Sequence, residues 1–148
     1  MLMTMPPFDI LIAEDNEDDI LLIQEAFSEG NIINRIAIVR DGEEALAYVR
    51  GEGHFRRAPL PGMLLLDINM PKKNGLEVLD EIKADLRLRA LPVIMLTVSE
   101  RDEDILRAFA HGACSYIRKP VTLSRFTEVV KELERYWSLV SKIPTLAR

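Results

Sequence analysis

Short apolar runs alternate with amphipathic segments along most of the chain. The apolar runs have strand length, and in the segments between them apolar residues recur at three- and four-residue steps, which is typical of helices. Because the apolar runs contain few polar positions, we expect strands that are buried on both faces, as in a parallel sheet. The predicted strands cover residues 8–13, 35–39, 63–67, 92–97 and 114–117.

Capping residues indicate where the helices between these strands begin. A side-chain oxygen at the position before a helix can accept an N–H group of the first turn. Gly30 and Gly112 are placed to end two of the helices,. Residues 51–62 are rich in Gly, Pro and Arg with little periodicity, and we expect an exposed loop there,. The predicted helices begin at Asn16, Asp41, Asn74 and Ser99 and near Thr122.

The alternation of strands and helices predicts an α/β fold with a doubly wound parallel sheet. We expect five strands in the order 2-1-3-4-5, the flavodoxin-like arrangement, covered by five helices. A chain of 148 residues is of the usual size for one domain,. We therefore expect a single domain over residues 1–148, with its core at about 8–131 and a helical extension and tail over 132–148.

Composition and charge narrow the choice of environment and partners. With 48% hydrophobic residues and no apolar run near the roughly 20 residues that cross a bilayer, we expect no membrane association,. The first residues lack the basic start and apolar core of a signal peptide, so we expect a cytoplasmic location. A net charge of −5 argues against direct nucleic-acid binding,. Cys114 is the only cysteine, which excludes an internal disulfide, and we expect it to be a small core residue,.

Acidic residues stand at the carboxyl ends of two predicted strands. Glu14 and Asp15 follow the first strand, and Asp67 ends the third. These strands are neighbours in the expected sheet, so their carboxylates converge at the edge where such sheets bind ligands. Crowded carboxylates repel one another unless a cation or protons neutralise them. Oxygen-only ligation predicts Mg²⁺ rather than Zn²⁺, and the backbone carbonyl of Asn69 can add a further ligand.

The same edge carries groups that suit phosphoryl transfer. A carboxylate is a nucleophile for phosphoryl groups and gives an aspartyl phosphate, and Asp67 is the candidate. Thr97 ends the fourth strand with a hydroxyl, and Lys119 follows the fifth strand with an ammonium group, so both can neutralise phosphoryl oxygens. A cis bond between Lys119 and Pro120 would be one way to aim the lysine at this site.

Together these residues resemble the receiver domain of two-component response regulators, from residue 9 to about 131. The resemblance implies that Asp67 accepts phosphate from a sensor histidine kinase or a small phosphodonor, while Glu14, Asp15 and the Asn69 carbonyl help to hold Mg²⁺. It also implies that Thr97 and Lys119 bind the phosphoryl oxygens and that Tyr116 is an aromatic switch. The residues that carry the resemblance stand in family order: Glu14-Asp15, Asp67, Pro71, Gly75, Thr97 and Lys119-Pro120.

A narrower resemblance is to the single-domain regulators that partner bacterial phytochromes. It rests on the loop 51–62, the turn 71–75 and the Tyr136-Trp137 tail. Val98 is bulkier than the small residue usual after the family's threonine, which predicts slow loss of phosphate. In this interpretation the chain is not an enzyme for an external substrate, because it catalyses only its own phosphorylation and slow autodephosphorylation.

Two other functions remain open at this point. A Mg²⁺-dependent phosphatase would use Asp67 in turnover, but such enzymes usually need a second acid nearby, and Asn69 stands where it would be. A binding module independent of phosphorylation would keep the fold alone. The intact set of site residues speaks against it: Glu14, Asp15, Asp67, Thr97 and Lys119.

We expect no output module after the receiver segment, so the predicted signal leaves through a protein surface. We expect a two-fold homodimer through the helix 99–112, the fifth strand, the last helix and the tail. The alternative is that the tail folds back on its own domain. The apolar residues expected at this surface are Leu106, Ala110, Tyr136, Trp137, Leu139 and Val140.

Overall fold

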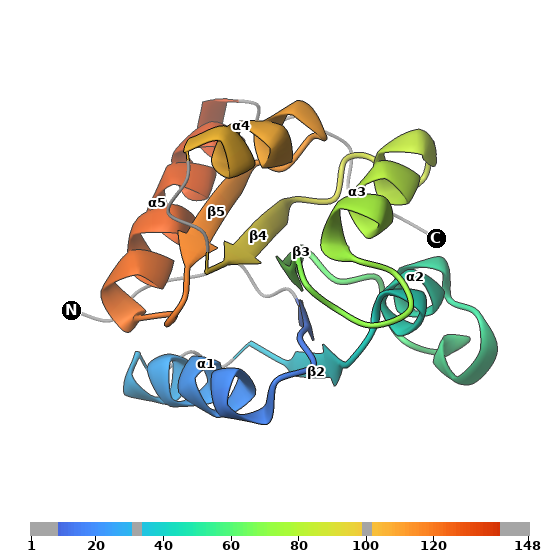
Figure 1. Ribbon diagram of the computed structural model, residues 1–148, viewed down its shortest axis with the longest axis horizontal. Coiled ribbons are helices and arrows are strands. Elements are labelled where there is room, and N and C mark those ends of the chain that lie inside the picture. The colour runs from blue at the N-terminus through green and yellow to red at the C-terminus, as the bar shows by residue number, and fades with distance from the viewer. Residues whose placement is uncertain (1–8, 31–33, 99–101, 140–148) are drawn as a thin grey trace.

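A parallel sheet between two layers of helices forms the centre of the molecule (Figure 1). The computed structural model describes residues 9–30, 34–98 and 102–139, and within them the side chains of all but 102–104 and 133–139. The strands are β1 (Ile10–Ala13), β2 (Ile36–Val39), β3 (Met63–Asp67), β4 (Val93–Thr97) and β5 (Ser115–Arg118). The helices are α1 (Glu17–Glu29), α2 (Gly42–Arg50), α3 (Gly75–Ala84), α4 (Asp102–Ala110) and α5 (Leu123–Leu139), with a 3₁₀ turn η1 (Gly53–Phe55).

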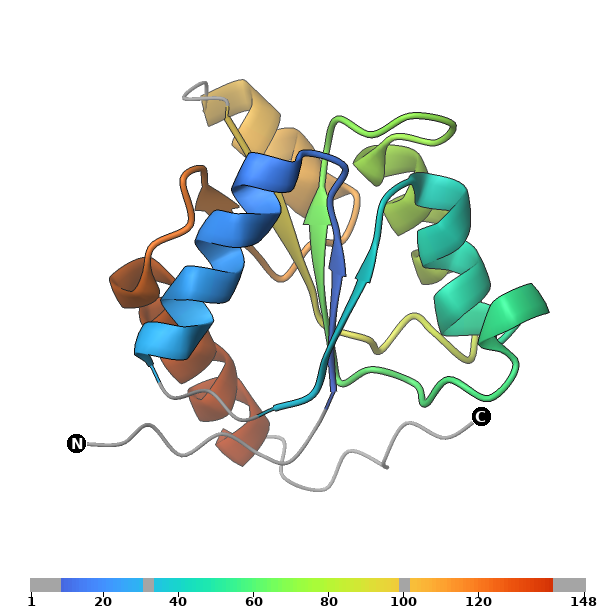
Figure 2. The same cartoon turned by 90° about the horizontal axis from the view of Figure 1, so that it is seen from below.

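The strand order β2-β1-β3-β4-β5 confirms the predicted topology. All neighbouring strands are parallel, and β1 lies between β2 and β3, with Ile12 opposite both Ile38 and Leu65. The carboxyl ends of the strands therefore lie at one edge of the sheet (Figure 2). Within the described part of the chain, none of the helices combines the length and apolar character needed to cross a bilayer.

Alternate residues of the central strands face two separate apolar cores. Leu64 and Leu66 of β3 face the core that is covered by α2 and α3, whereas Leu65 faces the core between the sheet and helices α1 and α5 (Figure 2). In the second core the rings of Phe27 and Phe126 pack with their centroids 4.4 Å apart. A strand that is buried on both faces explains the unbroken apolar run at 63–66.

Three of the predicted helix caps are confirmed. Asn16, Asp41 and Asn74 each accept a hydrogen bond from the backbone N–H of the third residue of the helix that follows. Asn74 also forms a capping box with Glu77, whose side chain accepts the Asn74 N–H,. These caps fix the short loops between strand ends and helix starts. The expected cap at Ser99 lies outside the described residues.

The prediction that Cys114 is a core residue is wrong. Cys114 is exposed, because β5 begins at Ser115, one residue later than predicted. Ser115 and Ile117 are the buried residues of this strand. The thiol of Cys114 lies at the amino-terminal edge of the sheet and donates to the carbonyl of Val93 at 3.3 Å.

Gly75 allows α3 to start directly on the end of β3. Its N–H donates to the carbonyl of Ile68 at 2.7 Å. A Cβ atom at this position would lie 2.3 Å from the backbone oxygen of Asp67, which is far closer than such atoms approach. The glycine is therefore a packing requirement of the strand end that carries the candidate site.

We expect Gly75→Ala to lower the free energy of unfolding by about 3 kcal/mol, because the new methyl group collides with rigid backbone. Gly53→Ala is the control: its φ is +58° but a Cβ there meets nothing within 4 Å, so a loss of about 1 kcal/mol is expected from the backbone conformation alone. Urea unfolding of both variants measures the difference. Equal losses would contradict the close approach of α3 to Asp67.

Candidate functional site

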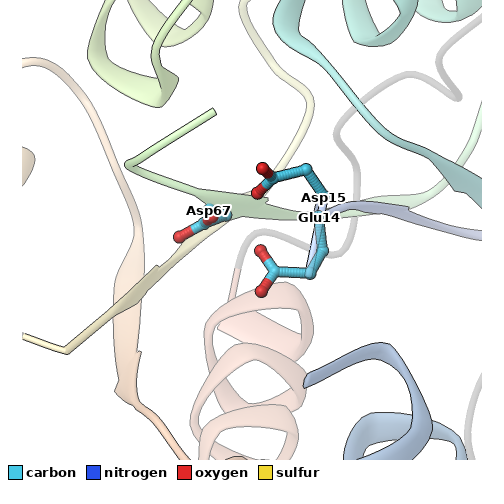
Figure 3. A group of neighbouring side chains, drawn as sticks. All are labelled: Glu14, Asp15 and Asp67. Atoms are coloured by element: carbon cyan, nitrogen blue, oxygen red, sulfur yellow. The ribbon is translucent and has the colours of Figure 1, made fainter. Parts of the chain in front are cut away.

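Three carboxylates from two neighbouring strands meet at the carboxyl edge of the sheet. Asp67 is the last residue of β3, while Glu14 and Asp15 directly follow β1, which pairs with β3 in parallel. One oxygen of each carboxylate lies within 4.8 Å of the others (Figure 3). The structure thus brings together the three acidic residues that the predicted strand order places at this edge.

The donor set fits a hard divalent cation. Glu14 and Asp67 are buried and Asp15 is exposed, so the cluster combines two sheltered carboxylates with one that faces solvent. In the described part of the chain, the Oε2 atom of Glu14 is buried and has no hydrogen-bond partner. Buried polar atoms are nearly always satisfied. An unsatisfied carboxylate oxygen beside two further carboxylates is what a Mg²⁺ site with several remaining waters requires.

Lys119 supplies a positive charge to the same cluster. Its Nζ atom lies 2.5 Å from Glu14 Oε1, 3.0 Å from Asp19 Oδ2 and 3.1 Å from Asp67 Oδ1. The peptide bond between Lys119 and Pro120 is cis, as considered from the sequence. Lys119 is therefore a largely buried member of the site and not a solvated surface lysine.

Burial and ion pairing shift the ionisation of this group of residues. Burial raises the pKa of Glu14, the neighbouring Asp67 acts in the same direction, and the hydrogen bond from Lys119 opposes them,. Burial alone would lower the pKa of Lys119, but its hydrogen bonds to Glu14 and Asp19 outweigh this and raise it. Lys119 is thus a cation at neutral pH, while Glu14 holds a proton more readily than an ordinary glutamate.

Thr97 and Asn69 lie next to this cluster along the chain. Thr97 ends β4 with its side chain buried, and its carbonyl accepts the Lys119 N–H at 2.8 Å, so the ends of β4 and β5 are tied together. Asn69 is exposed, two residues beyond Asp67. The roles of the Thr97 hydroxyl in phosphoryl binding and of the Asn69 carbonyl in metal binding stay predictions.

Sequence reasoning did not find Asp19 as a member of the site. It recognised this residue as a first-turn acid of a helix, which is a common and purely local role. The signal that could have found it is its place one helical turn after Asp15, on the helix that begins beside the acidic edge,.

Tyr116, the predicted switch, is half-buried between two side chains. Its ring meets Phe109 of α4 edge to face, with centroids 6.1 Å apart. The guanidinium of Arg125 from α5 lies 5.3 Å from the centre of the same ring and donates to the Tyr116 carbonyl at 3.0 Å. Val98, after Thr97, is exposed. The switching role of Tyr116 stays a prediction.

Comparison with known proteins identifies the family. The family model of the response regulator receiver domain matches residues 10–131. The chain belongs to this family, whose members act in two-component signalling, bind Mg²⁺ or Mn²⁺ at an acidic cluster and interact with histidine kinases.

Individual relatives include regulators that work with phytochromes. The chain is 44% identical over 132 residues to the probable methanogenesis regulatory protein FilR2 of Methanothrix harundinacea, covering 88% of this chain and 84% of that one. It is 34% identical to the response regulator Rcp1 of Synechocystis, covering 94% and 95%. The structure of the phosphorylated cyanobacterial phytochrome response regulator RcpA is 40% identical, with a TM-score of 0.76 and coverage of 95% and 100%. The resemblance to phytochrome response regulators is thereby confirmed.

We expect Mg²⁺ to bind at the acidic cluster and to stabilise the fold, since a ligand that binds only the folded state shifts unfolding by mass action. Asp15→Asn removes one carboxylate ligand and should weaken Mg²⁺ binding by about tenfold or more. Asp18→Asn removes the same charge from a nearby exposed residue outside the cluster, and should leave the affinity close to that of the wild type. Titration calorimetry measures both. Equal weakening by the two variants would argue for general charge attraction and against a site.

Proposed function

We propose that this protein is a phosphoacceptor response regulator in which Asp67 receives a phosphoryl group from a sensor histidine kinase. The observation that carries the proposal is the contact of Lys119 with Asp67 beside two further carboxylates. This arrangement supplies a nucleophile, a fixed cation and a metal-binding cluster at one point. The relative RcpA is described in its phosphorylated form, which supports the same chemistry here.

In the proposed reaction, a carboxylate oxygen of Asp67 attacks the phosphorus atom of the donor. A new bond forms between this oxygen and phosphorus, while the bond from phosphorus to the donor's leaving group breaks and its electron pair leaves with that group. The developing charge lies on the phosphoryl oxygens, where positioned cations and donors lower the barrier most. Lys119 supplies an ammonium group, and Thr97 supplies a hydroxyl at the end of the adjacent strand.

Glu14, Asp15 and Asp67 are the residues that would hold Mg²⁺, with the Asn69 carbonyl as a fourth protein ligand. A divalent ion bound there neutralises the carboxylates and the incoming phosphoryl group. The unsatisfied oxygen of Glu14 supports this assignment. The Mn²⁺-bound structure of Rcp1, which is 34% identical with a TM-score of 0.73, also supports a divalent ion at such a site.

The proposed partner is a sensor kinase, and the phytochrome regulators among the relatives make a phytochrome kinase the first to test. In this proposal Asp67 is itself the acceptor of the phosphoryl group, so the protein acts as a switch and not as an enzyme for external substrates. The proposed location is the cytoplasm.

Labelling with acetyl phosphate and Mg²⁺ tests the acceptor. We expect intact-mass measurement to show one added phosphoryl group on the wild type and none on Asp67→Asn, because the amide is not a nucleophile for phosphorus. Asp18→Asn is the control and should be labelled at the wild-type rate. Labelling of Asp67→Asn to the wild-type extent would refute the assignment, and steady release of phosphate from ester substrates would favour a phosphatase instead.

The proposed signalling surface lies on the α4 side of the domain. Leu106 and Phe109 of α4 are 66% and 43% exposed, which is a large apolar area beside Tyr116 of β5. Exposed apolar patches of this kind mark interaction sites. We propose that a second copy of the chain covers this surface, which α4, β5 and α5 form, to give a two-fold dimer. The tail residues expected to take part lie outside the described side chains.

Sedimentation of wild type and Leu106→Glu, each with and without phosphodonor, tests this dimer. We expect the charged side chain to weaken association by about tenfold or more, because it would be buried without a partner. Leu86→Glu is the matched control, since Leu86 is 76% exposed and lies after α3, outside the proposed surface. A wild type that stays monomeric in both states would rule the dimer out.

A further inference from the structure

Lys119 donates hydrogen bonds to Glu14 and Asp19 and forms an ion pair with Asp67. An ammonium group carries three N–H donors. Around Nζ of Lys119 lie three carboxylate oxygens, from Glu14, Asp19 and Asp67, at 2.5, 3.0 and 3.1 Å. A phosphoryl oxygen that binds Lys119 would be a fourth acceptor. Binding of a phosphoryl oxygen by Lys119 therefore competes with its contacts to these carboxylates.

The three carboxylates differ in how easily they can leave Lys119. Glu14 is fully buried, so water cannot readily replace its contact with Lys119,. Asp67 carries the phosphoryl group itself, so its own contact with Lys119 passes to that group. The side chain of Asp19 is 26% exposed, and water can replace its lysine contact,.

The position of Asp19 is fixed by the start of α1. Its backbone N–H donates to the side chain of the capping residue Asn16 at 3.0 Å, which holds the first turn against the site. The side-chain Oδ2 atom of Asp19 accepts a hydrogen bond from Lys119 Nζ at 3.0 Å. Asp19 therefore lies in a fixed place beside the lysine that the proposed phosphoryl transfer needs.

We propose that Asp19 is a positioning residue that holds Lys119 in the unphosphorylated protein and exchanges it for the phosphoryl group on phosphorylation. The proposal rests on the function proposed above and adds a residue to it. As the bond from Asp67 to phosphorus forms and the donor's bond breaks, Lys119 keeps its three protons and changes one acceptor. Asp19 receives a hydrogen bond from water in return. Asp19 thus sets the rate of labelling by competing with the phosphoryl oxygens.

Three variants labelled with limiting acetyl phosphate at saturating Mg²⁺ test this role. We expect Asp19→Ala to be labelled about fivefold faster than the wild type, which is the fold-change expected for removing a partly exposed competing ion pair. Asp18→Ala loses the same charge from the same helical turn, and should stay at the wild-type rate. Asp19→Glu restores a carboxylate and should return the rate to within about twofold of the wild type, which a merely structural role would not require.

Labelling of Asp19→Ala at or below the wild-type rate, with urea unfolding unchanged, would overturn the proposal. If Asp19→Ala is less stable, Asp19→Asn is measured in its place, and a rate at or below that of the wild type again overturns it. These outcomes are separate from the acceptor test. If Asp67→Asn is still labelled, the proposed function is refuted. If Asp67→Asn is not labelled but the Asp19 variants are labelled at the wild-type rate, only the role of Asp19 is refuted.

Discussion

The site depends on one electrostatic balance, between the Lys119 ammonium and the carboxylates that the sheet brings together. Parallel pairing of β1 with β3 forces Glu14 and Asp67 to the same edge, where both are buried. Buried carboxylates without a counter-charge would each destabilise the fold by several kcal/mol. Lys119 from the end of β5 partly compensates them, and the unsatisfied oxygen of Glu14 shows that the compensation is incomplete. The charge at this site is therefore only partly balanced. A bound divalent cation would add positive charge to it, and a phosphoryl group would add negative charge.

The backbone around Asp67 explains why the charged groups of the site are held in fixed positions. The Asp67 carbonyl lies under Gly75, so helix α3 starts against the strand end. On the other side, the Lys119 N–H is bound to the Thr97 carbonyl at 2.8 Å. The side chains of Asp67 and Lys119 are therefore carried by backbone that packing and hydrogen bonds fix. Such pre-organisation would serve the proposed phosphoryl transfer, which leaves the protein little to do beyond positioning and charge neutralisation.

The sequence predicts the strands, their order and the three acidic residues, because hydrophobic periodicity and strand-end position are local signals. The contact between Asp19 and Lys119 is different in kind. It joins residues 100 positions apart, and the direction of the lysine side chain across the edge leaves no mark in the periodicity. The prediction for Cys114 is wrong for a smaller reason. The strand β5 begins one residue later than predicted, so Cys114 lies outside it.

The contacts that hold Tyr116 and a hydrogen bond from Lys119 have comparable energies. This comparison bears on how a signal could leave the site. Tyr116 is held by an edge-to-face contact with Phe109, worth about 0.5–1.5 kcal/mol,, and by the Arg125 guanidinium, worth about 0.5–1 kcal/mol at a partly exposed site,. A hydrogen bond between charged groups, such as one from Lys119 to a phosphoryl oxygen, contributes about 1.5–3 kcal/mol. Because β5 carries Tyr116 and runs directly into Lys119, we expect the exchange of such a bond to shift the population of Tyr116 conformers. Tyr116 is only half-buried where it packs against the core, so its contacts hold it less firmly than full burial would.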